Sequence, residues 1–352
     1  MSSAARAAQS QSGYLNHRFL ILMRCFFVLL LINLIISIPY ACSMDAGGVA
    51  GKKTIAAEAL LQGRMNYYPD TSNLEGNIGF NLPNVRFGLR GQLGQAFYYR
   101  TYFNLENGFD LKCAYLGYFY SDAFRIQAGL MKPVQSQDYF ISTGSTDFIF
   151  RSRAGEMLVH SYEAGIAAEG DIGRFYYFSG FFSGNGNLPE RKQHYLIGRL
   201  QYSVGSFLPG ELTLGVQGSH GNSEGVTSGS TGPVIWGKRS IYGADFRLEG
   251  DRILLAGEYM SGLLDTDNVK VNPERINGFY LTSGYYILEK TMVLGRFQVW
   301  RQREAGLGGQ RLTFGINQSL AGIFRFQLNY DIHDPDPGDT IHGFSALLQM
   351  KF

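Results

Sequence analysis

Apolar and polar residues alternate along many short segments of the chain. Near the carboxyl end, every second residue from Phe344 to Phe352 is apolar, while Gln349 and Lys351 lie at intervening positions. The same alternation occurs over 324–332, 311–317, 242–249, 124–130 and 85–93. A period of two with one apolar face predicts a half-buried strand. The predicted strands cover residues 55–68, 85–93, 96–105, 111–120, 124–132, 161–170, 174–183, 194–203, 211–219, 240–249, 252–261, 276–286, 291–300, 310–319, 323–332 and 341–352.

The connections between these segments mostly alternate in length. Gly94-Gln95 and Gly250-Asp251 are short, whereas 133–160, 220–239 and 262–275 are long. A soluble sandwich gives the same strand pattern, but short turns on one rim and long loops on the other are typical of outer-membrane barrels. The sequence therefore predicts an all-β fold. We expect a transmembrane antiparallel barrel of about sixteen strands over 55–352, with short periplasmic turns and long extracellular loops.

The amino-terminal region differs from the rest of the chain. Residues 19–38 are almost all apolar, Arg18 and Arg24 precede or interrupt them, and Ala41-Cys42-Ser43 follows. A basic start, an apolar middle and a small-residue cleavage site are typical of a signal peptide. The stretch after Arg24 is shorter than the roughly 20 residues that span a bilayer. We predict an N-terminal extension and signal peptide over 1–43, a short periplasmic lead-in over 44–54, and export to the bacterial outer membrane. A membrane anchor and a lipoprotein cut before Cys42 are the alternatives.

Composition supports strands and excludes several functions. Aromatic residues make up 14% of the chain, charged residues only 17%, and there are 45 glycines. The formal net charge is +2 and the basic residues are scattered, so we expect no nucleic-acid partner. Cleavage after Ser43 would leave Cys113 as a single cysteine, which makes no internal disulfide. Neither the histidines nor the loop aspartates have a convincing metal-ligand spacing, and we predict no metal and no cofactor.

One short motif resembles that of a serine hydrolase. Gly221, Ser223 and Gly225 fit the pattern G-x-S-x-G. That nucleophile elbow needs a strand before it and a helix after it. Here it lies in a segment rich in glycine and serine, which we predict to be a loop. We therefore expect no catalytic residue and no enzyme activity.

Polar faces that point inward would place many arginines in the barrel lumen. A surplus of positive charge in a narrow aqueous pore concentrates anions, and arginine binds phosphate or carboxylate through two parallel hydrogen bonds. Alternatively, arginine–acid pairs brace the wall and favour no ion. Acids predicted on the same faces are Glu163, Glu169, Asp245, Glu249, Glu258 and Asp331. The candidate pore-lining residues are Arg86, Arg90, Arg100, Arg125, Lys132, Arg199, Arg247, Arg296, Arg311 and Arg325.

The longest internal connection is a candidate constriction. Residues 134–160 form the third connection on the loop rim and contain Arg151, Arg153 and Asp147. Long loops without predicted secondary structure are usually functional or disordered. We expect this loop to fold into the lumen, with an exposed cap as the alternative.

Four segments resemble one known family. They are RFGLRGQLG at 86–94, FRIQAGLMKP at 124–133, the strand Tyr162–Ile166, and FSGFFSGNGN at 178–187. In their order and spacing they are similar to the phosphate-selective porin O and P family. The resemblance implies a sixteen-stranded trimeric pore with an inward-folded third loop. The family's phosphate-binding residues have no residue-by-residue match here, which leaves phosphate selectivity open.

Together these features predict a passive outer-membrane channel for small hydrophilic solutes. A preference for phosphate-like anions is the finer expectation. The alternatives are a general non-selective porin and a non-catalytic surface or adhesin barrel. The expected partners are the permeating solutes, outer-membrane lipid and two further copies of the chain in a homotrimer.

Overall fold

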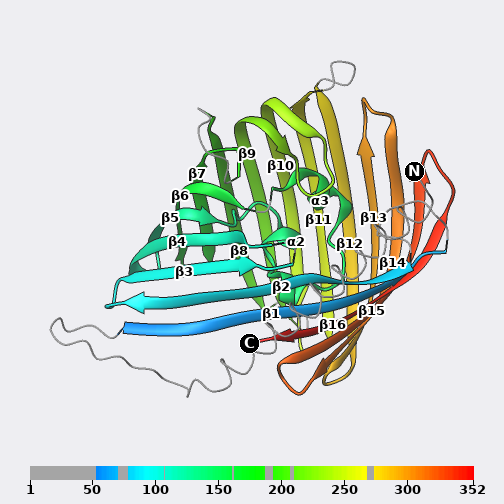
Figure 1. The fold of residues 1–352 in the computed structure, drawn as a ribbon, viewed down its shortest axis with the longest axis horizontal. Coiled ribbons are helices and arrows are strands. Elements are labelled where there is room, and N and C mark those ends of the chain that lie inside the picture. The colour runs from blue at the N-terminus through cyan, green and yellow to red at the C-terminus, as the bar shows by residue number, and fades with distance from the viewer. Residues whose placement is uncertain are drawn as a thin grey trace, which may run out of the picture. The chain divides into compact units, whose positions relative to one another are not determined.

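The computed structural model describes residues 53–69, 78–106, 108–160, 162–186, 193–206, 210–267 and 273–352. Within these residues, sixteen antiparallel strands form one closed barrel, in which sequence neighbours pair and β1 closes against β16 (Figure 1). The predicted fold class is confirmed, while the predicted signal peptide lies outside the described residues. The strands are β1 Lys53–Tyr67, β2 Ile78–Leu93, β3 Phe97–Asn104, β4 Asp110–Ser121, β5 Phe124–Met131, β6 Glu163–Ile172, β7 Phe175–Phe182, β8 Tyr195–Ser206, β9 Glu211–Thr227, β10 Val234–Glu249, β11 Ile253–Thr266, β12 Glu274–Leu288, β13 Thr291–Gln302, β14 Leu307–Leu320, β15 Phe324–Asp336 and β16 Ile341–Lys351.

The two faces of the sheet have opposite character. On β16, Phe344 and Leu348 are 48% and 54% exposed on the outside, whereas Ser345 and Gln349 are buried on the inside. Outward-facing apolar side chains and an inward polar face are what a closed barrel in lipid requires. The alternation in the sequence therefore corresponds to an outer and an inner surface.

Where β1 pairs with β16 to close the barrel, here called the seam, one end of β1 extends beyond β16. The pairing of β1 with β16 runs from Tyr67 opposite Phe344 to Leu60 opposite Lys351. The backbones of Ala59 and Phe352 then exchange two hydrogen bonds, of 2.9 and 3.2 Å. Among the described residues, the segment 53–58 pairs only with β2. The carboxyl-terminal residue is thus part of the seam.

The barrel wall is tall on one side and low on the other. Strands β9 to β12 have 14 to 17 residues, whereas β3, β5 and β7 have 8 residues each. The connection that we predicted over 220–239 is mostly strand, because β9 continues to Thr227 and β10 begins at Val234. The motif Gly221–Gly225 therefore lies in β9, not in a loop, and no helix follows it.

The connection between β5 and β6 contains three short helices. They are α2 Gln137–Phe140, η1 Thr143–Ser145 and α3 Arg153–Leu158. Figure 1 shows α2 and α3 among the strands, on the inner side of the sheet. No helix in the described part of the chain has the length and apolar character needed to cross a membrane.

Candidate functional site

The segment 132–160, here called the inner loop, packs against the inside of the barrel. Phe148, Met157, Leu158 and Val159 are each at most 1% exposed. Helix α3, which belongs to this segment, lies next to β11, β12 and β13. The inner loop is therefore a packed part of the barrel interior.

The first leg of the inner loop is held by one carboxylate. Glu258 on β11 accepts hydrogen bonds from the Ser136 hydroxyl at 2.9 Å and from the Gln137 backbone N–H at 3.0 Å. It also accepts one from Gln217 on β9 at 3.0 Å. The Ser136 hydroxyl oxygen in turn accepts from the backbone N–H of Tyr139, which caps α2. A buried carboxylate needs such partners, and here most of them come from the loop.

The tip of the inner loop is held by side-chain amides. Gln62 on β1 and Gln349 on β16 donate to the carbonyl oxygens of Thr143 and Gly144, at 3.5 and 2.9 Å. Two more amides reach the next part of the tip: Gln327 on β15 donates to the Thr146 carbonyl at 3.2 Å, and Asn317 on β14 donates to the Asp147 carbonyl at 2.8 Å. Amides from four adjacent strands thus hold carbonyls within residues 143–147, and we call this set of contacts the amide clamp.

Two arginines fix the middle of the inner loop. Arg247 on β10 forms an ion pair with Asp147 at 2.9 Å, and Arg296 on β13 donates to the Phe150 carbonyl oxygen at 2.8 Å. Both arginines were expected to line a pore. Arg296 is only 2% exposed, so its role here is to hold the loop against the wall.

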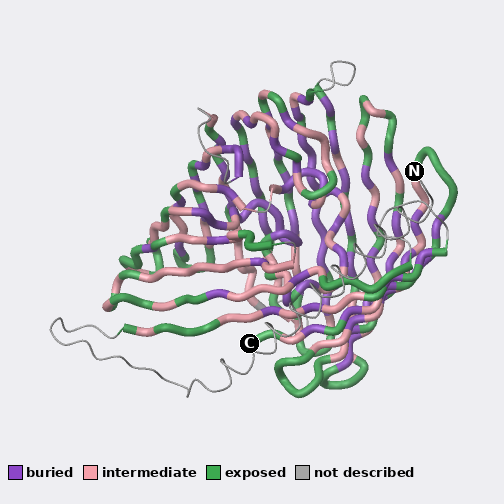
Figure 2. Tube along the Cα trace, in the orientation of Figure 1, coloured by how far each residue is buried: buried purple, intermediate pink, exposed green. Residues whose placement is uncertain are grey.

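An apolar cluster lies inside the barrel between α3 and the tall wall. Ala154, Met157, Leu158 and Val159 of the inner loop are buried with side chains of β10 to β13. The wall residues of this cluster are Ile235, Ile241, Met260, Leu264, Ile276 and Trp300. A purely polar interior, as assumed from the alternation, is therefore wrong for this half of the barrel. Figure 2 shows the buried residues concentrated along β9 to β13.

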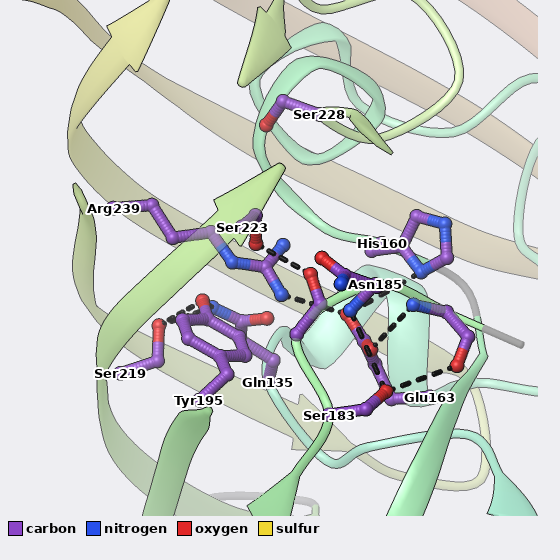
Figure 3. A network of polar contacts seen from close by, with 12 residues as sticks. Gln135, His160, Glu163, Ser183, Asn185, Tyr195, Ser219, Ser223, Ser228 and Arg239 are labelled. Atoms are coloured by element: carbon purple, nitrogen blue, oxygen red, sulfur yellow. Dashed lines mark hydrogen bonds and ion pairs between the residues drawn. The ribbon is translucent and has the colours of Figure 1, made fainter. Parts of the chain in front are cut away.

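A buried ion pair close to the end of the inner loop connects β6 with β10 (Figure 3). Glu163, at the start of β6, accepts from Arg239 on β10 at 2.7 Å, and both side chains are at most 1% exposed. The other Glu163 oxygen accepts from the Gly186 backbone N–H at 2.8 Å. The Arg239 guanidinium lies over the Tyr195 ring at 3.5 Å. Burial lowers the pKa of the neighbouring His160.

The part of the barrel wall formed by β2 to β5, here called the open wall, is less buried than the part formed by β9 to β13. Most residues of β2 to β5 are half-buried or exposed, as Figure 2 shows. Arg90 and Arg100 both contact Glu58, at 3.2 and 2.9 Å. These three side chains line a cavity of about 620 Å³ together with Tyr98 and Tyr115.

Three basic residues meet where the inner loop faces this open wall. Lys132 and Arg151 both donate to the Ile141 carbonyl oxygen, at 3.4 and 2.8 Å. Arg86 on β2 donates to the Thr143 hydroxyl at 3.2 Å. Burial, followed by the positive charges of Arg151 and Arg86, lowers the pKa of Lys132 well below its usual value. We call Arg86, Lys132 and Arg151 the basic cluster.

The remaining candidate residues divide into wall contacts and loop contacts. Arg199 pairs with Asp245 at 2.7 Å with both side chains fully buried, and Arg125 pairs with Glu169 at 3.0 Å. Arg311 is 2% exposed. Arg325 lies within electrostatic reach of Asp147. In the inner loop, the Arg153 backbone N–H donates to Gln298 at 2.8 Å. Arg199 therefore fits the alternative in which arginine–acid pairs brace the wall, because its side chain is not exposed to the lumen.

Several interacting residues were not anticipated from the sequence. Arg239 and Glu58 lie on inward faces, but Arg239 belongs to a segment predicted as loop, and the alternation around Glu58 is too weak to assign a face. Asn317, Gln327 and Gln349 of the clamp were on the expected face, yet an inward amide gives no signal about the loop that it will contact.

Comparison with known proteins gives one family match and several structural matches. The family model for phosphate-selective porins O and P matches residues 59–310. No curated protein sequence matches the chain.

Among solved structures, the chain is similar to an anion-selective porin from Comamonas acidovorans, with 12% identity, 86% of this chain and 100% of that chain covered, and a TM-score of 0.62. It is also similar to in-vitro folded OmpT of Vibrio cholerae in its trimer form, with 13% identity, 85% and 99% coverage, and a TM-score of 0.63. Salmonella typhi OmpF in complex with daunomycin matches with 10% identity, 86% and 98% coverage, and a TM-score of 0.62. At these identities the structural matches establish the shared fold.

Proposed function

Since the chain belongs to the phosphate-selective porin O and P family, we propose that this outer-membrane channel for small solutes carries anions in preference to cations. The observation that supports the proposal is the basic cluster, where Arg86 on the open wall faces Lys132 and Arg151 of the inner loop. A charged lining in a narrow, low-dielectric pore acts directly on the permeating ion.

The acidic side chains near the basic cluster and the open wall already form ion pairs with arginines or hydrogen bonds with the inner loop. Asp147 is paired with Arg247, and Asp138 accepts from the Ser152 backbone N–H at 2.6 Å. Glu58 is shared between Arg90 and Arg100. The charges named here nevertheless sum to a positive value, because two acids, Glu58 and Asp138, stand beside four arginines: Arg86, Arg90, Arg100 and Arg151.

We expect a permeating anion to pass from the basic cluster toward the rim of the barrel that carries the short turns. Arg86 and Arg90 lie four residues apart on β2, a rise of about 13 Å along a strand. Arg90 is directly opposite Arg100 on β3. An anion that leaves the basic cluster would meet this second pair of guanidinium groups before it reaches the rim.

A homotrimer is part of the proposal. The low wall at β3 to β7 is shorter than the rest of the barrel, and a short wall suits the centre of an oligomer, where protein rather than lipid would cover it. The similar OmpT of Vibrio cholerae has been solved in a trimer form. Chemical cross-linking of the purified protein in detergent would test the oligomeric state.

Ion selectivity in planar bilayers tests the main proposal. The purified full chain should form open channels, and reversal potentials across a KCl gradient should report a higher permeability for chloride than for potassium. Arg86→Gln should lower this ratio, because it removes one charge of the basic cluster. Arg174→Gln is the matched control, since Arg174 lies in the exposed turn between β6 and β7, where it donates to the Val204 carbonyl oxygen. A wild-type channel that prefers potassium or shows no preference would refute the anion proposal.

A further inference from the structure

The cavity on the open wall combines charge with aromatic rings. It has a volume of about 620 Å³ and lies against β1 to β4, on the side of the short turns. Glu58, Arg90 and Arg100 supply its charged lining, and Tyr98 and Tyr115 contribute its inner aromatic lining. The contacts of the amide clamp come from β1 and β14 to β16 at the level of residues 143–147, so they leave this cavity open.

The charged part of the cavity has more donors than its one acid can use. The two Glu58 oxygens contact Nε of Arg90 and Nε of Arg100, at 3.2 and 2.9 Å. The side chains of Arg90 and Arg100 are 64% and 39% exposed, whereas that of Glu58 is 13% exposed. Each guanidinium carries five N–H donors, so two of them beside one carboxylate leave both donors and a positive charge for a ligand.

The Tyr98 ring, which lines the cavity, packs against the barrel wall. The Tyr98 ring lies across Gly117 of β4, where an added Cβ would come within 2.1 to 2.6 Å of three ring carbons. One ring face therefore packs on the glycine, and the opposite face is left toward the cavity. The Tyr98 hydroxyl donates to Gln127 on β5 at 3.4 Å, which holds the outer end of the ring in place.

A second ring completes a corner beside the arginines. Tyr115 lies 6.2 Å from Tyr98 between ring centroids, and the two planes are inclined at 81°. Tyr115 is also directly opposite Arg100 across β3 and β4. A flat ligand that stacks on Tyr98 would meet the second ring on one side and a guanidinium group at its edge.

We propose that this cavity binds small carboxylates whose acid group is attached to a planar ring, of which benzoate is the simplest probe. The carboxylate accepts from Arg90 and Arg100, and the ring lies on the open face of Tyr98 beside Tyr115. The proposal rests on the anion channel proposed above and adds a site that selects among anions. An anion without a ring would engage the arginines and leave the aromatic corner unused.

Block of chloride current tests this site in the purified full chain. Benzoate added on the short-turn side should reduce the single-channel chloride conductance at concentrations where acetate and benzamide have little effect, because acetate has no ring and benzamide no charge. Stacking of one ring is worth about 0.5–1.5 kcal/mol, or roughly a two- to thirteenfold change in affinity. Tyr98→Leu should therefore raise the half-blocking benzoate concentration about two- to thirteenfold, and Arg90→Gln should raise it as well.

Two further variants separate the site from general effects. Tyr98→Phe keeps the ring and should retain most of the block. Tyr118→Leu changes an exposed outer-face tyrosine that contacts Phe97 and should leave the block unchanged. Equal block by benzoate and acetate, or a block that survives Tyr98→Leu, would overturn the ring-carboxylate site while the anion channel stands. Absence of chloride channels would instead refute the proposed function itself.

Discussion

Gln349 on β16 donates through Nε2 to the carbonyl oxygen of Gly144 at 2.9 Å, across a sequence separation of 205 residues. The strand that completes the barrel thus holds the tip of a loop that begins at the end of β5. Three more strands contribute amides to the same segment of the loop. The position of the inner loop therefore depends on barrel closure.

The amide clamp should protect the inner loop from proteolysis. Replacing Gln349 and Gln327 together by Leu leaves the Gly144 and Thr146 carbonyls without these donors, at a cost of about 1 kcal/mol each. The tip should detach more often, and trypsin should then cleave after Arg151 or Arg153 faster than in the wild type. Mass spectrometry of timed digests measures the rate.

Gln310→Leu is the control for this digest, because Gln310 is an exposed amide on the other face of β14. Equal cleavage rates in the double variant and the control would show that the amides do not hold the tip.

Glu258→Leu should destabilise the barrel strongly. It removes the acceptor of the Ser136 hydroxyl, the Gln137 N–H and the Gln217 amide, all of which are buried. Leaving several buried donors unsatisfied costs about 3 kcal/mol or more. The midpoint of denaturant unfolding of the folded barrel in detergent should fall accordingly. Glu249→Leu, at a side chain that is 59% exposed, should shift the midpoint far less.

The Glu163–Arg239 pair should show strong coupling in a double-mutant cycle. Glu163→Gln leaves the buried Arg239 charge without its carboxylate, which costs about 3–5 kcal/mol. Arg239→Met likewise leaves the buried Glu163 carboxylate without its arginine partner. The double variant should therefore be less destabilised than the sum of the two single variants, as measured by thermal unfolding. Additive effects would mean that the two side chains contribute independently.

Anion preference should depend on pH through Lys132. Its pKa is lowered by burial and by Arg151 and Arg86, so the ammonium loses its proton below the pH at which an ordinary lysine does. Lowering the pH through that pKa restores a positive charge in the basic cluster. The chloride-to-potassium permeability ratio should therefore rise as the pH falls through the lowered pKa of Lys132, below about 10, where an ordinary lysine is already protonated.

Lys132→Met should flatten this pH dependence. Lys112→Met is the matched control, because Lys112 lies in β4 and its ammonium pairs with Asp110. A pH profile that persists in Lys132→Met would assign the titration to another group.

The sequence was sufficient for the barrel wherever a strand crosses lipid. On β14, apolar Phe314 and Ile316 alternate with Thr313 and Asn317 because one face meets hydrocarbon and the other does not. The same reasoning failed on β9 beyond Ser219. There both faces carry mostly polar or small residues, so the segment resembles a loop.

The site was harder to anticipate because its partners are distant in sequence. Alternation places Arg199 and Arg100 on the inner face alike, yet the former is sealed against Asp245 and the latter lines a cavity. Which of the two is accessible depends on what covers the wall. That is decided by contacts such as Glu258 with Ser136, separated by 122 residues, which a period of two cannot encode.

The apolar cluster between α3 and the tall wall limits how far the inner loop can move. Swinging the inner loop aside would expose Met157, Leu158 and Val159 together with their neighbours on β10 to β13. At about 1.5–3 kcal/mol for each large apolar side chain, this would cost on the order of 10 kcal/mol, comparable to the stability of a whole domain. A transmembrane voltage or a bound solute therefore acts on a rigid loop, and any gating must come from local rearrangement of side chains along the open wall.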